Sequence, residues 1–508
     1  MSESRSSFGG LGAVFFLAAF GAIAFFVQRQ TIPDSRDELR KPVTVVTDEV
    51  DDEAPAPVPW EDRVALDAMQ LTPIGVAGSP AENENENQEN PPGADLGEVD
   101  ETQARYVQGL GDGHELLFSL DPVLQESALT IFRNREVPYG AAVVLDLRDN
   151  SVLAMAGYSK MDPQVDPLEI LTTAWAPAAS TFKLITAASL LSHDKAAPNS
   201  RECFHGGLHG ITDDLLKDNP GQDTRCETLT SAIAHSYNLV IAKLALKHLD
   251  QASLVETAQA MLYETDIPFE FPLERSPALI PADANARAKV AAGFWHVDLS
   301  PVHAAIVASI FARGGIYQPP HVIAQVRAPD GSDLTPAPPK AERVLDKESA
   351  EAVAKMMLKT TTQGTAKKSF YDPQGTPFVP QAQVAGKTGS LTGKREPMLN
   401  YNWFIGFAPA DKPEVAFAVL LANEAKWKIK AHYAARRLVQ IYLQRREAIT
   451  EHREARLTGQ GLAMPKRDPE TGAVIATPKP AADPKPVEDA LPPPPGPVRA
   501  KAETAKAG

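Results

Sequence analysis

The stretch PAASTFKLITAASLL, from Pro177 to Leu191, places a serine and a lysine three residues apart at the start of an apolar run. If a helix begins at Ser180, Lys183 stands one turn later on the same face, where its amine reaches the serine oxygen. A hydroxyl needs an adjacent base to become a nucleophile, and burial next to cations lowers the pKa of a lysine towards that role. The structural alternative is that Ser180 only caps the helix and Lys183 is solvated.

Two later clusters carry polar groups of a different kind. In AHSYNLV, the hydroxyl of Ser236 is suited to proton relay and the amide of Asn238 to holding a peptide group. In VAGKTGS, a predicted strand combines a cation and two hydroxyls that suit a carboxylate with a glycine that lets another backbone approach: Lys387, Thr388, Gly389 and Ser390. Alone, each cluster is equally typical of a polar break in a helix or of a strand end.

Together the three clusters form an ordered set, S-x-x-K, S-x-N and K-T-G, with 56 and 151 residues between their first members. Each supplies a different step of an acyl transfer, which a chance arrangement would not do. A second S-x-x-K match, Ser192 to Lys195, lies at the polar end of the same helical run and is interpreted as chance.

Bulk composition excludes some classes of partner. The chain has 508 residues, 43% of them hydrophobic, and a formal net charge of -15. This charge argues against a nucleic-acid-binding surface, which needs clustered Lys and Arg. Much of it comes from residues 81–101, where eight acidic residues and no basic ones indicate a solvated segment.

The N-terminus predicts a membrane helix. Residues 8–27 contain no charge, and 20 residues of helix reach roughly 30 Å, the thickness of the hydrocarbon core. We expect residues 1–7 in the cytoplasm, a single pass through the inner membrane, and the rest of the chain in the periplasm. The alternative is a signal peptide cleaved near Ala22-Ile23-Ala24. The Lys and Arg residues that flank the span do not favour this orientation. We therefore infer the export of the catalytic domain from the cysteines.

The two cysteines, Cys203 and Cys226, lie in one irregular stretch. In an oxidising compartment, two nearby loop cysteines are most simply a disulfide. The alternative is a metal site that adds His205 and His209, although the spacing fits no common zinc pattern. His235, His296 and His303 lie in helical stretches and are interpreted as packing or surface residues.

The composition along the chain predicts one folded body between two open segments. Residues 28–115 are acidic and Pro-rich and are expected to be a mostly disordered tether; residues 451–508 are expected to be a disordered Pro/Ala/Lys-rich tail. Within residues 116–450, strands come first, then many helices, then strands and a last helix. This order predicts an α+β fold, with an antiparallel sheet built from both ends of the domain, flanking helices and an all-helical insert. Trp403 and Phe404 are expected in its core.

With these motifs, the sequence resembles the penicillin-binding proteins, the serine D,D-peptidases that cross-link peptidoglycan. The resemblance covers most of residues 116–450, including GFWHVDLSPVHAA, ARGGIYQPP, QGTA and NWFIGFAP. One departure is that Ala178-Ala179 stands where the family usually has Pro-Gly, which puts the turn before Ser180 in question. The resemblance implies the β-lactamase/transpeptidase-like fold.

The resemblance also implies residue roles. Ser180 is the nucleophile, Lys183 its base and Ser236 a proton relay. Asn238 holds the substrate backbone, and the terminal carboxylate is bound by the K-T-G strand. The backbone N–H groups of Ser180 and Ser390 form the oxyanion hole. The substrate is a stem peptide ending in D-Ala-D-Ala, β-lactams trap the acyl-enzyme, and no metal or organic cofactor is needed.

The subtype expected is a tethered transpeptidase without a glycosyltransferase or a large pedestal domain, working with other cell-wall synthesis proteins. Two alternatives remain. A D,D-carboxypeptidase or β-lactamase would use the same residues for hydrolysis. A catalytically silent cell-wall scaffold would use the cleft and the tail only for binding.

Overall fold

The computed structural model describes residues 63–65, 69–73, 104–110, 112–207, 210–294, 296–393, 398–425 and 428–457. The predicted membrane span, the signal-peptide alternative and nearly all of the predicted tail lie outside these residues. Among the residues described, no helix combines the length and the apolar character that crossing a bilayer requires.

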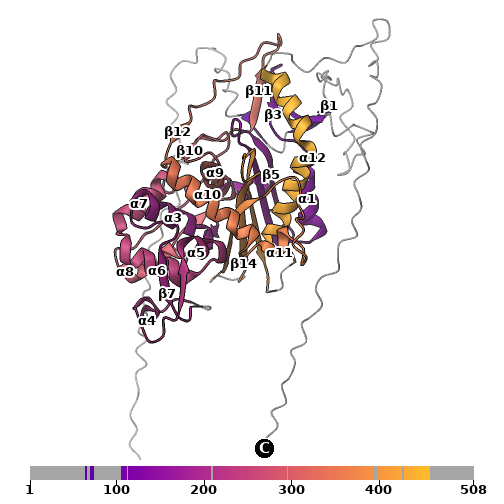
Figure 1. Cartoon of the computed structure of the whole chain (residues 1–508). Helices are drawn as coiled ribbons and strands as arrows, with labels where there is room; N and C mark the ends of the chain where they lie inside the picture. Colours follow the sequence, from indigo (N-terminus) through magenta and orange to yellow (C-terminus); the bar gives the residue numbers. More distant parts are fainter. Residues whose placement is uncertain are drawn as a thin grey trace, which may run out of the picture. The chain divides into compact units, whose positions relative to one another are not determined.

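A five-stranded antiparallel sheet forms the centre of the domain (Figure 1). Its order is β13-β14-β15-β4-β5, so two strands from the start of the domain join three from its end. This confirms the predicted α+β fold with a sheet built from both ends. The strands are β4 (Tyr139–Asp146), β5 (Val152–Ser159), β13 (Ala385–Thr392), β14 (Asn400–Ala408) and β15 (Val415–Asn423).

Both faces of this sheet are covered, which is why its central strands are apolar throughout. All nine residues of β15 are buried. Because successive side chains of a strand point to opposite faces, Trp403 and Phe404 enter two different hydrophobic clusters, and neither is exposed. Helices α1 (Pro122–Asn134), α11 (Lys367–Phe370) and α12 (Ala431–Leu457) supply the cluster around Phe404.

The helical part covers the other face (Figure 1), with α9 (Pro301–Ala312) against strands β4, β14 and β15. Eleven of the twelve residues of α9 are buried, as expected for a helix enclosed on all sides. Ser300 caps it through a hydrogen bond from the His303 N–H. The remaining helices are α2 (Pro167–Thr172), α3 (Lys183–Ser192), α4 (Asp213–Leu216), α5 (Leu229–His235), α6 (Asn238–His248), α7 (Gln251–Ala260), α8 (Ala284–Ala291) and α10 (Lys347–Thr362).

A second sheet, of order β1-β2-β3-β11, corrects the prediction for residues 28–115. Two segments of the predicted tether are strands, β1 (Gln70–Pro73) and β2 (Ala104–Gly109), and they extend β3 (Glu115–Phe118) and β11 (Ile323–Arg327). The physical reason is that β3 buries its apolar residues and leaves one backbone edge for a further strand. Short polar strands recruited in this way carry little sequence signal.

Three two-stranded pairings complete the structure. The pair β6 (Ala176–Pro177) and β9 (Asp298–Leu299) fixes the segment just before Ser180. The pair β7 (Arg201–Phe204) and β8 (Arg225–Thr228) carries the two cysteines opposite each other. The pair β10 (Ile316–Tyr317) and β12 (Glu342–Arg343) lies beyond α9.

Candidate active site

Ser180 lies in a 3-10 turn, Ala179–Thr181, and the α-helix α3 begins only at Lys183. The predicted helix start at Ser180 is therefore wrong by three residues. The turn is held by the Thr181 hydroxyl, which donates to the Ala178 carbonyl over 2.6 Å. Ala179 has a φ of 50°, a left-handed conformation that favours glycine. Ala179 stands where the resemblance leads us to expect Gly, and it adopts a conformation that favours glycine.

Lys183 is fully buried and lies within hydrogen-bond distance of all the other groups of the first two motifs. Its Nζ is 2.8 Å from the Ser180 Oγ, 3.0 Å from the Ser236 Oγ and 2.6 Å from the Asn238 Oδ1. Burial, together with the charge of Lys387, holds the pKa of Lys183 well below its usual range. A neutral amine has a lone pair, so Lys183 can accept the Ser180 proton.

The S-x-N motif forms the turn between two helices. Ser236 ends α5 in a left-handed conformation, with a φ of 59°, and Asn238 is the first residue of α6. This conformation is sparsely populated for a serine and is typical of functional sites, where the surrounding structure holds it. It directs the Ser236 hydroxyl between two lysine amines, because Lys387 Nζ also donates to Ser236 Oγ over 3.0 Å.

Lys387 brings in the third motif from β13, the edge strand of the central sheet. Its Nζ donates to the Thr388 carbonyl over 2.8 Å, in addition to Ser236. The side chain is completely buried, and burial lowers the pKa of Lys387 to about 7. An anion bound at this position would stabilise the charged form and raise that pKa again.

Gly389 explains how β13 approaches the Ser180 turn so closely. A Cβ there would lie 3.1 Å from the Thr181 Cγ2 and 3.3 Å from the Ala178 carbonyl oxygen, so a side chain would require the strand or the turn to shift by a few tenths of an ångström. The neighbouring strand adds a second tie, because the buried Trp403 indole donates to the Pro177 carbonyl over 2.9 Å. The sheet and the Ser180 turn are thereby fixed to each other.

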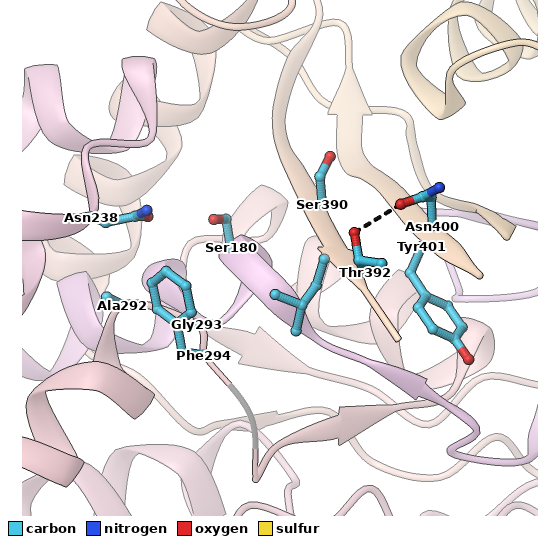
Figure 2. Close-up of a pocket in the computed structure, with 10 residues that line it drawn as sticks. Ser180, Asn238, Ala292, Gly293, Phe294, Ser390, Thr392, Asn400 and Tyr401 are labelled. Carbon is cyan, nitrogen blue, oxygen red and sulfur yellow. Dashed lines mark hydrogen bonds between the residues drawn. The ribbon is translucent and has the colours of Figure 1, made fainter. Parts of the chain in front are cut away.

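A cavity of about 350 Å³ opens beside these groups (Figure 2). Figure 2 shows Ser180 and Asn238 from the helical part facing Ser390 and Thr392 on β13. Backbone and side chains of both sheet and helices line it: Ser180, Asn238, Ala292, Gly293, Phe294, Ser390, Leu391, Thr392, Asn400 and Tyr401. Ser390 is exposed and lines this cavity.

Two residues at the site have no role in the sequence-based prediction. The Thr365 hydroxyl lies 2.7 Å from the Thr388 hydroxyl, and its segment, QGTA, was noted only as part of the family resemblance. The buried amide of Asn402 donates to the Ser390 Oγ over 2.9 Å, while its oxygen accepts from the Ala431 N–H. Their positions depend on partners distant in sequence, so no local motif could have indicated these contacts.

Cys203 and Cys226 are joined by a disulfide. Both sulfurs are therefore unavailable to the alternative metal site; of its two histidines, His205 pairs with Asp223 and His209 lies outside the described residues. Across the part of the chain that the structure describes, no group of three or more His, Cys, Asp or Glu side chains is placed to hold a metal ion.

The three histidines considered earlier take no part in the polar cluster around Lys183. His303 is buried and pairs with the Met261 carbonyl, and burial lowers its pKa to about 4. The His235 ring stacks on Tyr237, with ring centroids 5.4 Å apart. His296 lies in the bend just before β9. The second S-x-x-K match lies at the far end of α3, where Lys195 is exposed.

Comparison with known proteins gives relatives of one kind. Peptidoglycan D,D-transpeptidase PbpA of Mycobacterium tuberculosis is 26% identical over 320 residues, which cover 56% of this chain and 62% of that protein. The protein of the same name from Mycolicibacterium smegmatis is 28% identical over 281 residues, covering 52% and 53%. This chain therefore spans between about half and three fifths of the length of these two relatives.

Solved structures share the fold. The D,D-transpeptidase domain of a peptidoglycan glycosyltransferase from Eggerthella lenta superposes with a TM-score of 0.53 at 22% identity, covering 65% of this chain and 82% of that one. The imipenem acyl-enzyme complex of penicillin-binding protein A from M. tuberculosis gives a TM-score of 0.53 at 21% identity, covering 65% and 79%.

The chain also matches a protein family. The family described as the penicillin binding protein transpeptidase domain matches residues 140–441, a segment that begins in β4 and ends within α12 and so includes all three motifs. The match covers more than half of the chain, and this chain therefore belongs to the penicillin-binding protein transpeptidase family.

Proposed function

We propose that this protein is a peptidoglycan D,D-transpeptidase that works through an acyl-enzyme on Ser180. The observation that carries the proposal is the position of the Lys183 amine, fully buried and within 3.0 Å of the Ser180, Ser236 and Asn238 side chains. A lysine used only for structure would instead be expected to pair with a carboxylate, as Lys243 does with Asp223.

In the acylation step, Ser180 Oγ attacks the carbonyl carbon of the penultimate D-alanine while Lys183 Nζ takes the hydroxyl proton. The C–O bond of the ester forms, the peptide C–N bond breaks, and Ser236 relays the proton to the leaving nitrogen of the last D-alanine. The backbone N–H groups of Ser180 and Ser390 are proposed to stabilise the oxyanion. The acylation as proposed requires no metal and no organic cofactor.

In the second step, an amine from a neighbouring peptidoglycan strand attacks the ester carbonyl and gives a proton to Lys183. The new peptide bond forms and Ser180 is released with its proton restored. The terminal carboxylate of the donor peptide is proposed to bind Lys387, Thr388 and Ser390, with Gly389 allowing the approach of β13. Asn238 would hold the donor backbone.

Labelling with a fluorescent penicillin tests the nucleophile. The wild-type protein should be labelled and Ser180→Ala should not. Ser192→Ala is the matched control, because Ser192 opens the other S-x-x-K match at the far end of α3, and it should label like the wild type. An unlabelled wild-type protein would favour the catalytically silent scaffold.

Product analysis with a stem-peptide donor and an amine acceptor tests the fate of the acyl-enzyme. Transpeptidation predicts a cross-linked dimer together with released D-alanine. D-Alanine without dimer would identify a carboxypeptidase, and rapid hydrolysis of penicillin would identify a β-lactamase. Lys387→Ala should fold normally but be acylated more slowly by substrates that carry a carboxylate.

We also propose that residues 8–27 anchor the protein in the inner membrane, with the catalytic domain in the periplasm and within reach of other cell-wall synthesis proteins. The uncharged 20-residue segment and the disulfide support this placement. Cell fractionation tests it: the full chain should sediment with membranes, and a chain lacking residues 1–27 should not.

A further inference from the structure

The two strands β7 and β8, joined by the Cys203–Cys226 disulfide, form a hairpin that contacts the S-x-N turn. We call these strands with their disulfide the cystine hairpin. None of its residues belongs to the three motifs. Its second strand runs directly into α5, which Thr228 caps and which ends at Ser236, so the hairpin and the turn are the two ends of one short helix.

The first contact is made with Tyr237, the middle residue of the motif. Arg225 of β8 lies over the Tyr237 ring, with its guanidinium carbon 4.4 Å from the ring centroid, and its Nη2 donates to the Tyr237 hydroxyl. Phe204 of β7 packs against the same ring at 5.8 Å between centroids, and the His235 ring stacks on it at 5.4 Å. The Tyr237 side chain is thus held by both strands of the cystine hairpin.

A second set of contacts fixes α6, the helix that begins at Asn238. The amine of Lys243, with no exposed surface, donates to Asp223 over 2.8 Å and to the Cys203 carbonyl over 2.9 Å. Burial alone would lower the pKa of Lys243, but the hydrogen bonds and charges of Asp223 and Asp218 outweigh it and raise that pKa.

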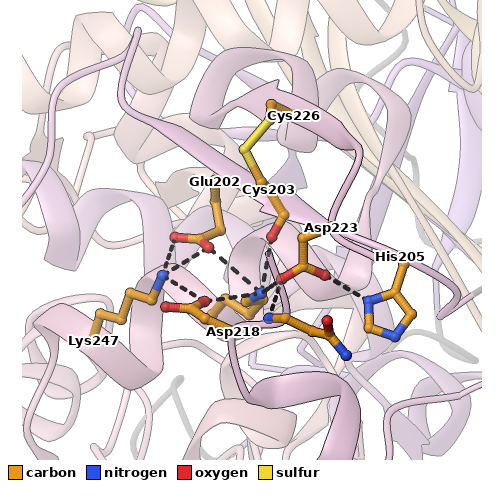
Figure 3. A network of polar contacts seen from close by, with 9 residues as sticks. Glu202, Cys203, His205, Asp218, Asp223, Cys226 and Lys247 are labelled. Atoms are coloured by element: carbon orange, nitrogen blue, oxygen red, sulfur yellow. Dashed lines mark hydrogen bonds and ion pairs between the residues drawn. A yellow bond between two sulfur atoms is a disulfide. The ribbon is translucent and has the colours of Figure 1, made fainter. Parts of the chain in front are cut away.

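One turn further along α6, Lys247 pairs with Glu202 of β7 over 2.8 Å. Figure 3 shows this network beside the disulfide, from Lys247 and Glu202 at one end to Asp223 and His205 at the other. The contacts therefore reach the turn from its middle residue and from the helix that follows it. Ion pairs of this kind are costly when one partner is removed, because a buried charge then remains unpaired.

The Arg225 contact bears on the backbone conformation of the S-x-N turn. Ser236 adopts a left-handed conformation that a serine rarely occupies. The backbone N–H groups of Ser236 and Tyr237 donate to carbonyls of α5, and the contacts of the Tyr237 side chain add a second restraint on the same turn. Tyr237 is the residue between Ser236 and Asn238, and fixing its ring fixes the backbone on both sides. We propose that Arg225 is a positioning residue for the S-x-N turn, acting through Tyr237 and presented by the cystine hairpin. This inference rests on the proposed acyl transfer at Ser180.

A kinetic comparison of Arg225 variants tests the proposal. Acylation by a fluorescent penicillin is followed by stopped flow, which separates the acylation rate constant from the initial dissociation constant. Arg225→Ala should lower the rate constant at least tenfold, and Arg225→Lys, which keeps a cation over the ring, should recover part of the loss. Arg201→Ala removes an exposed arginine of the same hairpin that bonds the Cys226 carbonyl instead. It should stay within twofold of the wild type.

A double-mutant cycle separates positioning from general loss of structure. If Arg225 acts through Tyr237, the double variant Arg225→Ala with Tyr237→Ala should be no slower than Tyr237→Ala alone. If the losses in acylation rate constant from Arg225→Ala and Tyr237→Ala simply add in the double variant, the proposal is overturned. Equal losses in rate constant for Arg225→Ala and Arg201→Ala would also overturn it, even if both variants lose thermal stability. An acylated wild type with an equally fast Arg225→Ala would overturn this inference alone. A wild type that is not acylated at all would remove the proposed function and this inference with it.

Discussion

Gly293 packs against Ala179, the residue that precedes the candidate nucleophile, so closely that a Cβ on Gly293 would lie 2.3 Å from the Ala179 carbonyl oxygen. Gly293 also has a φ of 88°, which L-amino acids with side chains rarely adopt. The loop after α8 therefore packs against the Ser180 turn, beside the cavity that Gly293 and Ser180 line. Contact and conformation both require glycine at this position.

Gly293→Ala should consequently damage the site. The left-handed conformation alone costs roughly 1–2 kcal/mol for an alanine, and relief of the clash must move the Ala179 carbonyl and with it Ser180. We expect acylation to slow more than tenfold and the thermal midpoint to fall by several degrees. Gly331→Ala is the control, since that glycine also has a positive φ but has open space around its Cα. Similar acylation rates in the two variants would contradict the assigned contact.

Ala179→Gly tests the departure from the family's usual Pro-Gly. Ala179 occupies a left-handed conformation with a φ of 50°, and glycine would remove a strain on the order of 1 kcal/mol, offset in part by the greater freedom of glycine in the unfolded chain. Urea unfolding should show a stability equal to or slightly above that of the wild type, with acylation retained. A loss above about 2 kcal/mol would indicate that the Ala179 methyl group has a packing role instead.

The low pKa of Lys387 predicts that stability rises with pH. Its pKa is about 7 when folded and about 10.4 when unfolded, so between these values the unfolded chain binds more protons than the folded one. Stability is then lowest below pH 7 and increases as pH rises towards the unfolded pKa. Lys183, whose pKa is also lowered, contributes with the same sign.

Urea unfolding between about pH 7 and pH 9.5, below the range in which tyrosines ionise, measures this effect. The free energy of unfolding of the wild type should increase by an amount on the order of a few kcal/mol. Lys387→Met should gain distinctly less, since it removes one of the two lysines whose pKa is lowered by folding. Lys359→Met, an ordinary lysine on α10, should behave like the wild type. Identical slopes for wild type and Lys387→Met would show that Lys387 is charged when folded.

Thr365 should take part in binding the substrate carboxylate. Its hydroxyl lies 2.7 Å from that of Thr388, and Thr365 is exposed, so both hydroxyls can turn towards an anion beside Lys387. A hydrogen bond to a charged group contributes about 1.5–3 kcal/mol, so Thr365→Val should slow acylation by benzylpenicillin about tenfold or more. Thr365→Ser should restore most of the rate. The methyl ester of the same penicillin has no anion, and the valine substitution should leave its slower reaction nearly unchanged.

How far the sequence predicted the structure depends on how local each signal is. Strands such as β4 and β15 are almost wholly apolar and could be recognised from a few residues, as could the α9 cap at Ser300. The strand β2 could not, because its sequence, ARYVQG, has no long apolar run and the strand is held by backbone pairing with β1 and β3. The α3 boundary was missed because a 3-10 turn and an α-helix have nearly the same side-chain pattern over three residues.

The same reasoning applies to the site. The three motifs have characteristic residue types at short spacing and were found. Thr365, Asn402 and Arg225 act on partners 23, 12 and 12 residues away in the chain, and those contacts exist only after the sheet and helices have packed. No pattern over a few neighbouring residues can therefore predict these contacts.

The pairing of β4 with β15 has a consequence for the protein during its synthesis. The central sheet needs strands that are nearly 300 residues apart, and K-T-G lies on the outermost of them. A nascent chain in which Ser180 and Lys183 have already been synthesised still lacks strands β13 to β15, which bring Lys387 to them. If Ser180 is the nucleophile, its reactivity should therefore appear late and abruptly, and unfinished chains should not be labelled by penicillins.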